Sequence, residues 1–283
     1  TLIQIVMKKY ITLLLLVLST TVLLAQKKEK IKGSKIVTTE RRDIDNFQEL
    51  VIEDNLEVHL ERGEKAEVKI EADENLHEII SLEQYNKTLR IYTTQLASSY
   101  KKMIVRVTYT DNLNLISSKN ESSINAIQEL LLDKVTINAF DSSKLFINVK
   151  TQNFVLQAGD KTKTELNLKS ENTTIELNKN ASLKALVVTD VLKVDQYQKS
   201  SATVEGNATS AAIRLDNNAS FTGNKLNTVS ATITTESYTN CSLFVEKEVI
   251  IDAINKSEIQ LLGSPKIEIS KFLDEAKLIK KLK

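Results

Sequence analysis

A three-residue polar cluster recurs along residues 121–257 at a nearly constant step, with a short aliphatic run on each side of it. The third residues of the eight clusters lie 20, 19, 20, 19, 19, 20 and 17 residues apart; they are Ser123, Ser143, Thr162, Ser182, Ser201, Ser220, Asn240 and Ser257. A step of this size is typical of a solenoid, in which each repeat is one supersecondary unit stacked on the next. This repeat constrains the fold more than any other property of the chain.

Each repeat contains two short runs in which apolar and polar residues alternate. Leu145, Ile147 and Val149 form one such run, and Ile213 and Leu215 flank the polar Arg214 in another. Alternation with period two indicates strands with one buried face, and the spacings of three and four that a helix needs are missing. We therefore predict a right-handed parallel β-helix over residues 116–270, with two strands in each coil of about 19–20 residues.

The polar clusters are expected at the corners of the coils. Ser, Thr and Asn side chains turn a chain by hydrogen bonding to nearby backbone groups. Stacked at a constant step, these side chains should lie above one another in successive coils. Both ends of such a stack must be covered, because one coil depends on its neighbours for backbone hydrogen bonds.

Residues 1–25 have the pattern of a secretory signal peptide with a short upstream remnant. Lys8 and Lys9 follow Met7, residues 11–24 form an apolar core, and Ala25 offers a small-residue cleavage point. The alternative is an uncleaved membrane anchor, although the core is short for a span of about 20 residues. The protein is thus expected to be exported to the periplasm, the outer-membrane surface or the medium. Residues 26–43 are lysine-rich and are predicted to be a polar tether.

Residues 44–115 are predicted to form a strand-rich N-terminal cap region. Residues 56–60 and 66–70 alternate around Gly63, a pattern that indicates a β-hairpin. Residues 75–80 are expected to form a helical turn. At the other end, residues 271–283 place Phe272, Ala276, Ile279 and Leu282 on one helical stripe, which predicts an amphipathic cap helix. A frayed basic tail is the alternative.

Three sequence stretches accompany this layout: FQELVI at residues 47–52, an alternating run at 107–116, and LGSPKI at 262–267. With the signal peptide and the Ser- and Asn-marked repeats, they resemble the putative auto-transporter adhesin head domain family, also called the GIN domain, over about residues 46–267. The family favours Gly-Ser-Gly corners, whereas this chain has six glycines and uses Asp, Asn, Lys and Ser. The resemblance implies an exported β-helical protein without an established activity.

The charge balance of the chain argues against a nucleic-acid partner. Residues 26–283 carry 36 basic and 37 acidic side chains, which gives a net charge of −1. Cys241 is the single cysteine and lies in an apolar run, where a packed side chain is expected and no disulfide within the chain can form. His59 and His77 lack neighbouring ligand patterns, so neither a metal nor a cofactor is predicted.

Two kinds of function remain. Asp195, Arg214 and Asp216 are the best candidates for a carbohydrate-active lyase or hydrolase, because Asp195 and Arg214 are 19 residues apart and should be neighbours on adjacent coils. A cross-coil ion pair on a solvated sheet explains these residues without catalysis and is the preferred interpretation. Phe146, Tyr197 and Phe244 could contact a surface glycan or another envelope protein, or could pack against the caps. We predict a non-catalytic, adhesin-like binding or structural protein, with the enzyme as the alternative.

Overall fold

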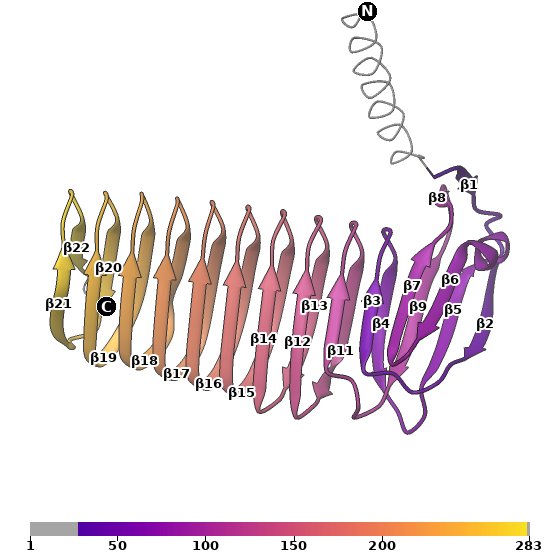
Figure 1. Cartoon of the computed structure of the whole chain (residues 1–283), viewed down its shortest axis with the longest axis horizontal. Coiled ribbons are helices and arrows are strands. Elements are labelled where there is room, and N and C mark those ends of the chain that lie inside the picture. The colour runs from indigo at the N-terminus through magenta and orange to yellow at the C-terminus, as the bar shows by residue number, and fades with distance from the viewer. Residues whose placement is uncertain (1–27, 282–283) are drawn as a thin grey trace, which may run out of the picture.

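The computed structural model describes residues 28–281, and Figure 1 shows them as a rod of stacked coils with a broader cap region at the N-terminal end. The signal-peptide prediction lies outside the described residues. Within residues 28–281, no helix is long and apolar enough to cross a membrane. The prediction of an all-β chain is confirmed, since the helix in the described part is a single 3₁₀ segment, η2 (Glu74–Ile79).

Residues 115–280 form a β-solenoid of about nine turns. Its strands are β10 (Leu115–Ser118), β11 (Ser123–Leu131), β12 (Lys134–Ala139), β13 (Lys144–Lys150), β14 (Asn153–Ala158), β15 (Lys163–Leu177), β16 (Ser182–Gln196), β17 (Ser201–Leu215), β18 (Ser220–Thr235), β19 (Asn240–Ala253), β20 (Glu258–Leu262), β21 (Lys266–Phe272) and β22 (Lys277–Lys280). Strands β15 to β19 each pass a corner, so both halves of one coil belong to a single long strand.

The coils stack through two parallel ladders, as the repeat predicts. In the first ladder Lys144 pairs with Lys163, which pairs with Ser182 on the next coil. In the second ladder Asn153 pairs with Asn172, which pairs with Val191. Two strands per coil and parallel stacking are therefore confirmed, while right-handed winding stays a prediction. Neighbouring strands in such a ladder lie about 4.8 Å apart.

A two-residue turn with positive φ at both positions closes each coil at one corner. Nine such pairs follow one another in the solenoid: Asn120–Glu121, Asp141–Ser142, Asp160–Lys161, Lys179–Asn180, Gln198–Lys199, Asn217–Asn218, Ser237–Tyr238, Asn255–Lys256 and Asp274–Glu275. These dihedrals belong to the type I′ turn, which is usually made by Asn, Asp or Gly. In every turn before the last, the second residue donates its N–H to the next coil, as Lys161 does to the Lys179 carbonyl at 3.0 Å.

The predicted register of the polar clusters is wrong by one residue at three corners. In the ladder, Ser123 lies beside Lys144, Lys163 and Ser182, and not beside Ser143 and Thr162. The step between corners therefore varies from 18 to 21 residues. The three corners were misassigned by one residue because the corners share a backbone conformation and not a residue type. Asp, Asn, Lys, Ser and Tyr all adopt that conformation here.

Side-chain hydrogen bonds at the corners are present in only part of the solenoid. The Thr162 hydroxyl donates to the Gly159 carbonyl at 2.6 Å, and the Ser122 hydroxyl donates to the Ile52 carbonyl at 3.2 Å. Ala181 and Ala219 occupy the equivalent buried position without any hydroxyl. Backbone hydrogen bonds between successive turns, rather than a Ser or Thr ladder, are therefore common to all the corners.

The cap region extends both ladders toward the N-terminus with strands that change direction. Its strands are β1 (Lys30–Lys32), β2 (Val37–Asp43), β3 (Glu49–Ile52), β4 (Glu57–Arg62), β5 (Glu67–Asp73), β6 (Ile80–Tyr85), β7 (Thr88–Thr93), β8 (Leu96–Ser98) and β9 (Met103–Tyr109). One ladder continues as β11–β4–β9–β5–β2, and the other continues as β12–β10–β3–β7–β6. Each ladder ends in an antiparallel pair, β5–β2 or β7–β6. The first coil of the solenoid is therefore covered by paired strands of the cap.

Two predictions for this region are corrected. Strands β4 and β5 do not form a hairpin, because β9 lies between them and pairs in parallel with β4 and antiparallel with β5. The two faces of β9 explain the insertion, since Val105 and Val107 are buried while Arg106 reaches Glu61 and Glu71 on the strands at either side. The predicted polar tether contains β1 and β2, and β2 is an edge strand of the sheet. The predicted helical turn is confirmed as η2.

The predicted C-terminal helix is wrong. Residues 266–280 form one more coil, in which β22 pairs in parallel with β20 and places Leu278 beside Ile259. Asp274 and Glu275 take the two left-handed turn positions that an α-helix excludes. In the observed strand Leu278 packs against the core, whereas Ile279, which the predicted helical stripe included, lies beside Gln260. Leu282 lies outside the described residues.

Candidate functional site

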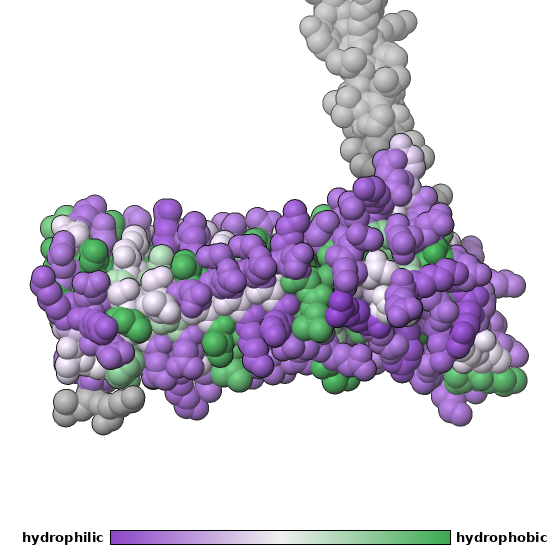
Figure 2. Space-filling view, turned by 90° about the horizontal axis from the view of Figure 1, so that it is seen from below, coloured by the Kyte–Doolittle hydropathy of each residue, from purple (hydrophilic) through white to green (hydrophobic). Residues whose placement is uncertain are grey.

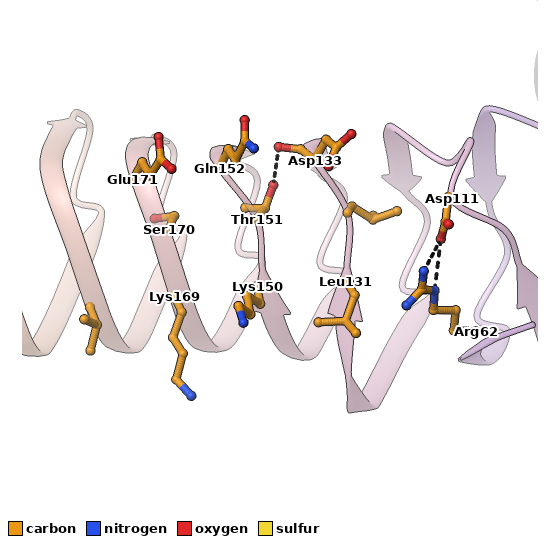
Figure 3. Close-up of a pocket in the computed structure, with 12 residues that line it drawn as sticks. Arg62, Asp111, Leu131, Asp133, Lys150, Thr151, Gln152, Lys169, Ser170 and Glu171 are labelled. Atoms are coloured by element: carbon orange, nitrogen blue, oxygen red, sulfur yellow. Dashed lines mark hydrogen bonds and ion pairs between the residues drawn. The ribbon is translucent and has the colours of Figure 1, made fainter.

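A groove of about 570 Å³ lies along the corner opposite the type I′ turns, where the first coils meet the cap region (Figure 3). Figure 2 shows this side of the molecule, with apolar patches interrupting a mostly hydrophilic surface. The groove crosses several coils and is lined by Arg62, Asp111, Leu131, Leu132, Asp133, Lys150, Thr151, Gln152, Lys169, Ser170, Glu171 and Val188. None of these was predicted as a site residue.

An irregularity in β11 opens the groove. The register of β11 against β13 shifts between Ala126 and Leu130, and the residues between them are exposed. Ile127 is the most exposed of the apolar residues there, at 78%. The shift also brings Leu131 to the surface at the groove. The sequence carries one sign of this site, since three consecutive leucines at 130–132 break the period-two alternation.

Four side chains from successive coils form a row along the groove. Leu131 lies in register with Lys150, Lys150 with Lys169, and Lys169 with Val188. No acidic side chain in residues 28–281 forms an ion pair with either lysine. The row thus presents two uncompensated positive charges between two exposed aliphatic side chains, a surface suited to an extended anionic ligand.

Hydrogen bonds hold the inner wall of the groove in one arrangement. The Thr151 hydroxyl and the Gln152 N–H both donate to the Asp133 carbonyl, at 2.9 and 3.0 Å. One coil further on, the Ser170 hydroxyl lies 3.1 Å from the hydroxyl of Thr189 on the following coil. Each corner is thus fastened to the next by side chains that are themselves largely buried, so the groove residues project from a rigid support.

An ion pair closes the groove at the end nearest the cap region. Arg62 donates to Asp111 through two nitrogens, at 2.9 and 2.6 Å (Figure 3). Both side chains are well exposed, so this pair adds little to stability. The pair therefore makes that end of the groove polar, next to the apolar Leu131 and Leu132.

The predicted site residues fall into two groups on opposite ladders. Asp195 and Arg214 are in register on adjacent coils, as predicted. Asp195 forms its ion pair with Lys193 on its own strand, at 3.1 Å, and the Arg214 guanidinium lies 5.8 Å from the centre of the Tyr197 ring. The expected cross-coil ion pair is thus replaced by these two contacts. Asp216 follows Tyr197 on the next coil, where its N–H donates to the Gln196 carbonyl at 3.0 Å.

The two phenylalanines lie on the other ladder, away from that group. Phe146 projects outward from β13 and is 39% exposed. Phe244 belongs to β19, pairs with Asn227 and Leu262 in register, and is half-buried. The structure therefore brings Asp195, Tyr197 and Arg214 together but places neither phenylalanine beside them.

Within residues 28–281, no group of three His, Cys, Asp or Glu side chains could hold a metal ion. His59 contacts Glu57 at 2.7 Å, and His77 lies between Thr38 and Glu40 at 2.9 and 3.2 Å. Cys241 is buried in the solenoid, and this burial raises the pKa of its thiol to about 12. A thiol with so high a pKa is a poor nucleophile at neutral pH.

The strongly perturbed carboxylates belong to the cap region and have structural partners. Hydrogen bonds from Lys102 and Arg106 lower the pKa of Glu71 to about 2. Burial opposes ionisation of Asp73, but the N–H groups of Lys35, Lys102 and Lys101 outweigh it and bring the pKa below its usual value. Asp73 thereby ties three backbone segments of the cap together, which accounts for its ionised state without catalysis.

Comparison with known proteins identifies the family. Residues 46–265, more than three quarters of the chain, match the family model described as "Putative auto-transporter adhesin, head GIN domain". No curated protein matches the chain.

Among solved structures, a "putative lipid binding protein" from Parabacteroides distasonis ATCC 8503 is 15% identical with a TM-score of 0.65, over 89% of this chain and 100% of that one. A "putative adhesin" from Parabacteroides merdae ATCC 43184 is 17% identical with a TM-score of 0.62, over 89% and 99% of the two chains. At these identities the likeness shows a shared fold. With the match of the family model, it follows that the chain is a member of the auto-transporter adhesin head GIN domain family.

Proposed function

We propose that this protein is an exported, non-catalytic binding module that holds an extended ligand, a surface glycan or a segment of another envelope protein, along the groove beside β11, β13 and β15. The observation that carries the proposal is the row Leu131, Lys150, Lys169 and Val188, which repeats charged and apolar side chains at the spacing of the coils. A ligand lying across the coils meets one such side chain about every 4.8 Å.

Two further considerations favour binding over catalysis. The groove carboxylates, Asp111, Asp133 and Glu171, come from three different segments, and Asp111 is already paired with Arg62. The groups with shifted pKa values that stand in the cap region are held by structural partners. The neighbours in fold described as adhesins and as a lipid binding protein suggest a binding role for this chain as well.

The alternative is a carbohydrate-active enzyme that uses Asp195, Arg214 and Asp216, which lie on one side of the second ladder. In most glycosidases two carboxyl groups flank the scissile bond. Here Asp195 is bound to Lys193, which leaves Asp216 as the carboxylate without an ion-pair partner in the described part of the chain.

The experiment is a glycan array run with the purified protein, together with an assay for depolymerisation of the glycans that bind. The Val188→Asp variant places a carboxylate in the groove row. The Val191→Asp variant is the matched control, because it changes the same residue type on the same strand at nearly equal exposure, 46% against 49%. We expect binding to fall at least tenfold in Val188→Asp and to change less than twofold in Val191→Asp. Release of reducing ends or unsaturated products by the wild-type protein would refute the non-catalytic proposal.

A further inference from the structure

Four lysines project outward from two neighbouring strands near the groove. They are Lys144 and Lys150 at the ends of β13, and Lys163 and Lys169 on the first half of β15. The outward positions between them hold Phe146, Asn148, Glu165 and Asn167. We call these eight side chains the lysine face. The whole sequence has a net charge of +1, so a face with four lysines and one glutamate is a marked local excess of positive charge.

The lysines are paired with each other rather than with acids. Lys144 is in register with Lys163, and Lys150 is in register with Lys169. Like charges directly opposite on adjacent strands destabilise a sheet. No ion pair to any of the four is formed in residues 28–281. Each pair therefore presents two positive charges whose repulsion an anionic group between them would relieve.

The spacing of the two pairs fits a long ligand. Six residues separate Lys144 from Lys150, which corresponds to roughly 20 Å along an extended strand. Lys163 and Lys169 repeat the same separation on the next coil. A ligand that reaches both pairs must therefore be extended and must carry anionic groups at two separate places, which a single small anion cannot do.

The middle of the lysine face offers contacts of another kind. Asn167 donates its side-chain N–H to the Asn148 oxygen at 3.0 Å, and Asn148 donates to the Ile127 carbonyl at 2.8 Å. These bonds fix both amides in place, and the Asn167 side chain is exposed. Phe146 adds an aromatic ring that is 39% exposed. A fixed amide beside an exposed ring is suited to a sugar, which has hydroxyl groups at its edge and apolar C–H groups on its face.

We propose that the lysine face binds a linear polysaccharide that carries carboxylate groups, such as a polyuronate, along the strand direction. This inference rests on the proposed function, because Lys150 and Lys169 also line the groove, and it refines the direction of the ligand: the polymer enters the groove at these two lysines and continues along β13 and β15. Ammonium groups at the two ends bind carboxylates, while Phe146 and Asn167 contact the sugar between them. An acidic peptide would use the lysines but would have no use for the ring and the fixed amides.

The test measures binding of polygalacturonate to the purified protein by titration calorimetry, with dextran as the neutral polymer and heparin as the sulfated one. The variant replaces Lys144, Lys150, Lys163 and Lys169 with Gln. The matched control replaces four exposed lysines elsewhere that also lack ion-pair partners in the described residues, namely Lys199, Lys247, Lys266 and Lys271, so the change in net charge is the same. Thermal unfolding of both variants verifies that they are folded.

We expect the four-lysine variant to lose at least tenfold in affinity for polygalacturonate and the control variant to lose less than threefold. Affinity should also fall as salt concentration rises. Phe146→Ala should weaken binding of polygalacturonate but not of polyglutamate. Equal loss in both four-lysine variants, equal affinity for heparin at the same salt concentration, or preference for polyglutamate would overturn the proposal. Binding of dextran that no lysine variant affects would overturn it while leaving the proposed binding function intact.

Discussion

The cap region and the repeated coils reach stability by different means. Of the fifteen ion pairs that Lys or Arg forms in the described residues, eleven join residues within 28–115 and four lie within 116–281. The cap combines antiparallel and parallel strands, and β9 pairs with a different orientation on each side. The coils use one parallel arrangement throughout, with one turn conformation and an aliphatic interior.

This difference shows how each region specifies which of its strands pair. In the coils every partner is the same element of the next repeat, so nearest-neighbour stacking specifies the pairing. In the cap the neighbouring strands differ from one another in sequence and direction. Charged pairs across strands, such as Arg106 with Glu61 and Glu71, favour the observed order of the strands in the sheet. We therefore expect a mutation in the coils to destabilise mainly its own coil and the adjacent ones. In the cap, we expect the loss of a charged pair to reduce stability.

The largest effect is expected for Phe221→Ala in the middle of the solenoid. Phe221 is 1% exposed and stacks between Ala202 and Cys241. Removing the ring should lower the free energy of unfolding by about 3–5 kcal/mol. Hydrogen exchange should rise in β17, β18 and β19 and stay unchanged in the cap. Phe146→Ala, which removes an outward-facing ring, is the control, and a uniform rise in exchange along the whole rod would contradict stacking between nearest neighbours.

A smaller, pH-dependent effect is expected for Glu71→Gln in the cap. The change should lower the free energy of unfolding by about 1–3 kcal/mol at pH 7, because Lys102 and Arg106 lose a charged hydrogen-bond partner. The folded-state pKa of about 2 lies below the usual 4.5, so the carboxylate stabilises the fold above pH 4.5 and this contribution is lost as the pH falls toward 2.

Urea unfolding of wild type and Glu71→Gln between pH 7 and pH 3 measures this effect. The gap between the two proteins should narrow steadily below pH 4.5. Glu246→Gln, at an exposed corner of the coils, should show no gap at any pH. A gap for Glu71→Gln that does not depend on pH would mean that packing, and not charge, joins the cap strands.

The smallest effect is expected at the turns. Lys161 has φ of 67°, a conformation that costs an L-residue roughly 1–2 kcal/mol. Lys161→Gly should remove this strain and raise the free energy of unfolding by up to about 1 kcal/mol, after the greater flexibility of glycine in the unfolded chain is deducted.

Lys163→Gly, two residues further on in β15, is the control and should destabilise by about 0.5–1 kcal/mol. Chemical denaturation of the two variants gives the comparison. Destabilisation of equal size at both positions would show that the type I′ conformation is not what the corners of the coils share.

The sequence predicted the stack of two-stranded coils because alternation and a constant step report directly on buried faces. It misplaced three corners by one residue, since the side chains at 141–143 and 160–162 do not distinguish the first turn position from the second. It also missed a tenth turn, Asp54–Asn55, which hydrogen-bonds to Asn120 across 65 residues and so breaks the period. The groove was missed for a related reason, because a register shift in β11 becomes visible only against its partner β13.

The sequence by itself determined that the chain is a solenoid and which side chains face inward, because period-two alternation and the repeated step are local properties that each coil carries. Only the tertiary structure decided the order of the cap strands, the extra coil at residues 266–280 and the groove with its paired lysines. These features depend on which edges are already occupied and on which residue of one coil lies beside which residue of the next. Such pairings join positions distant in sequence, and local pattern does not encode them.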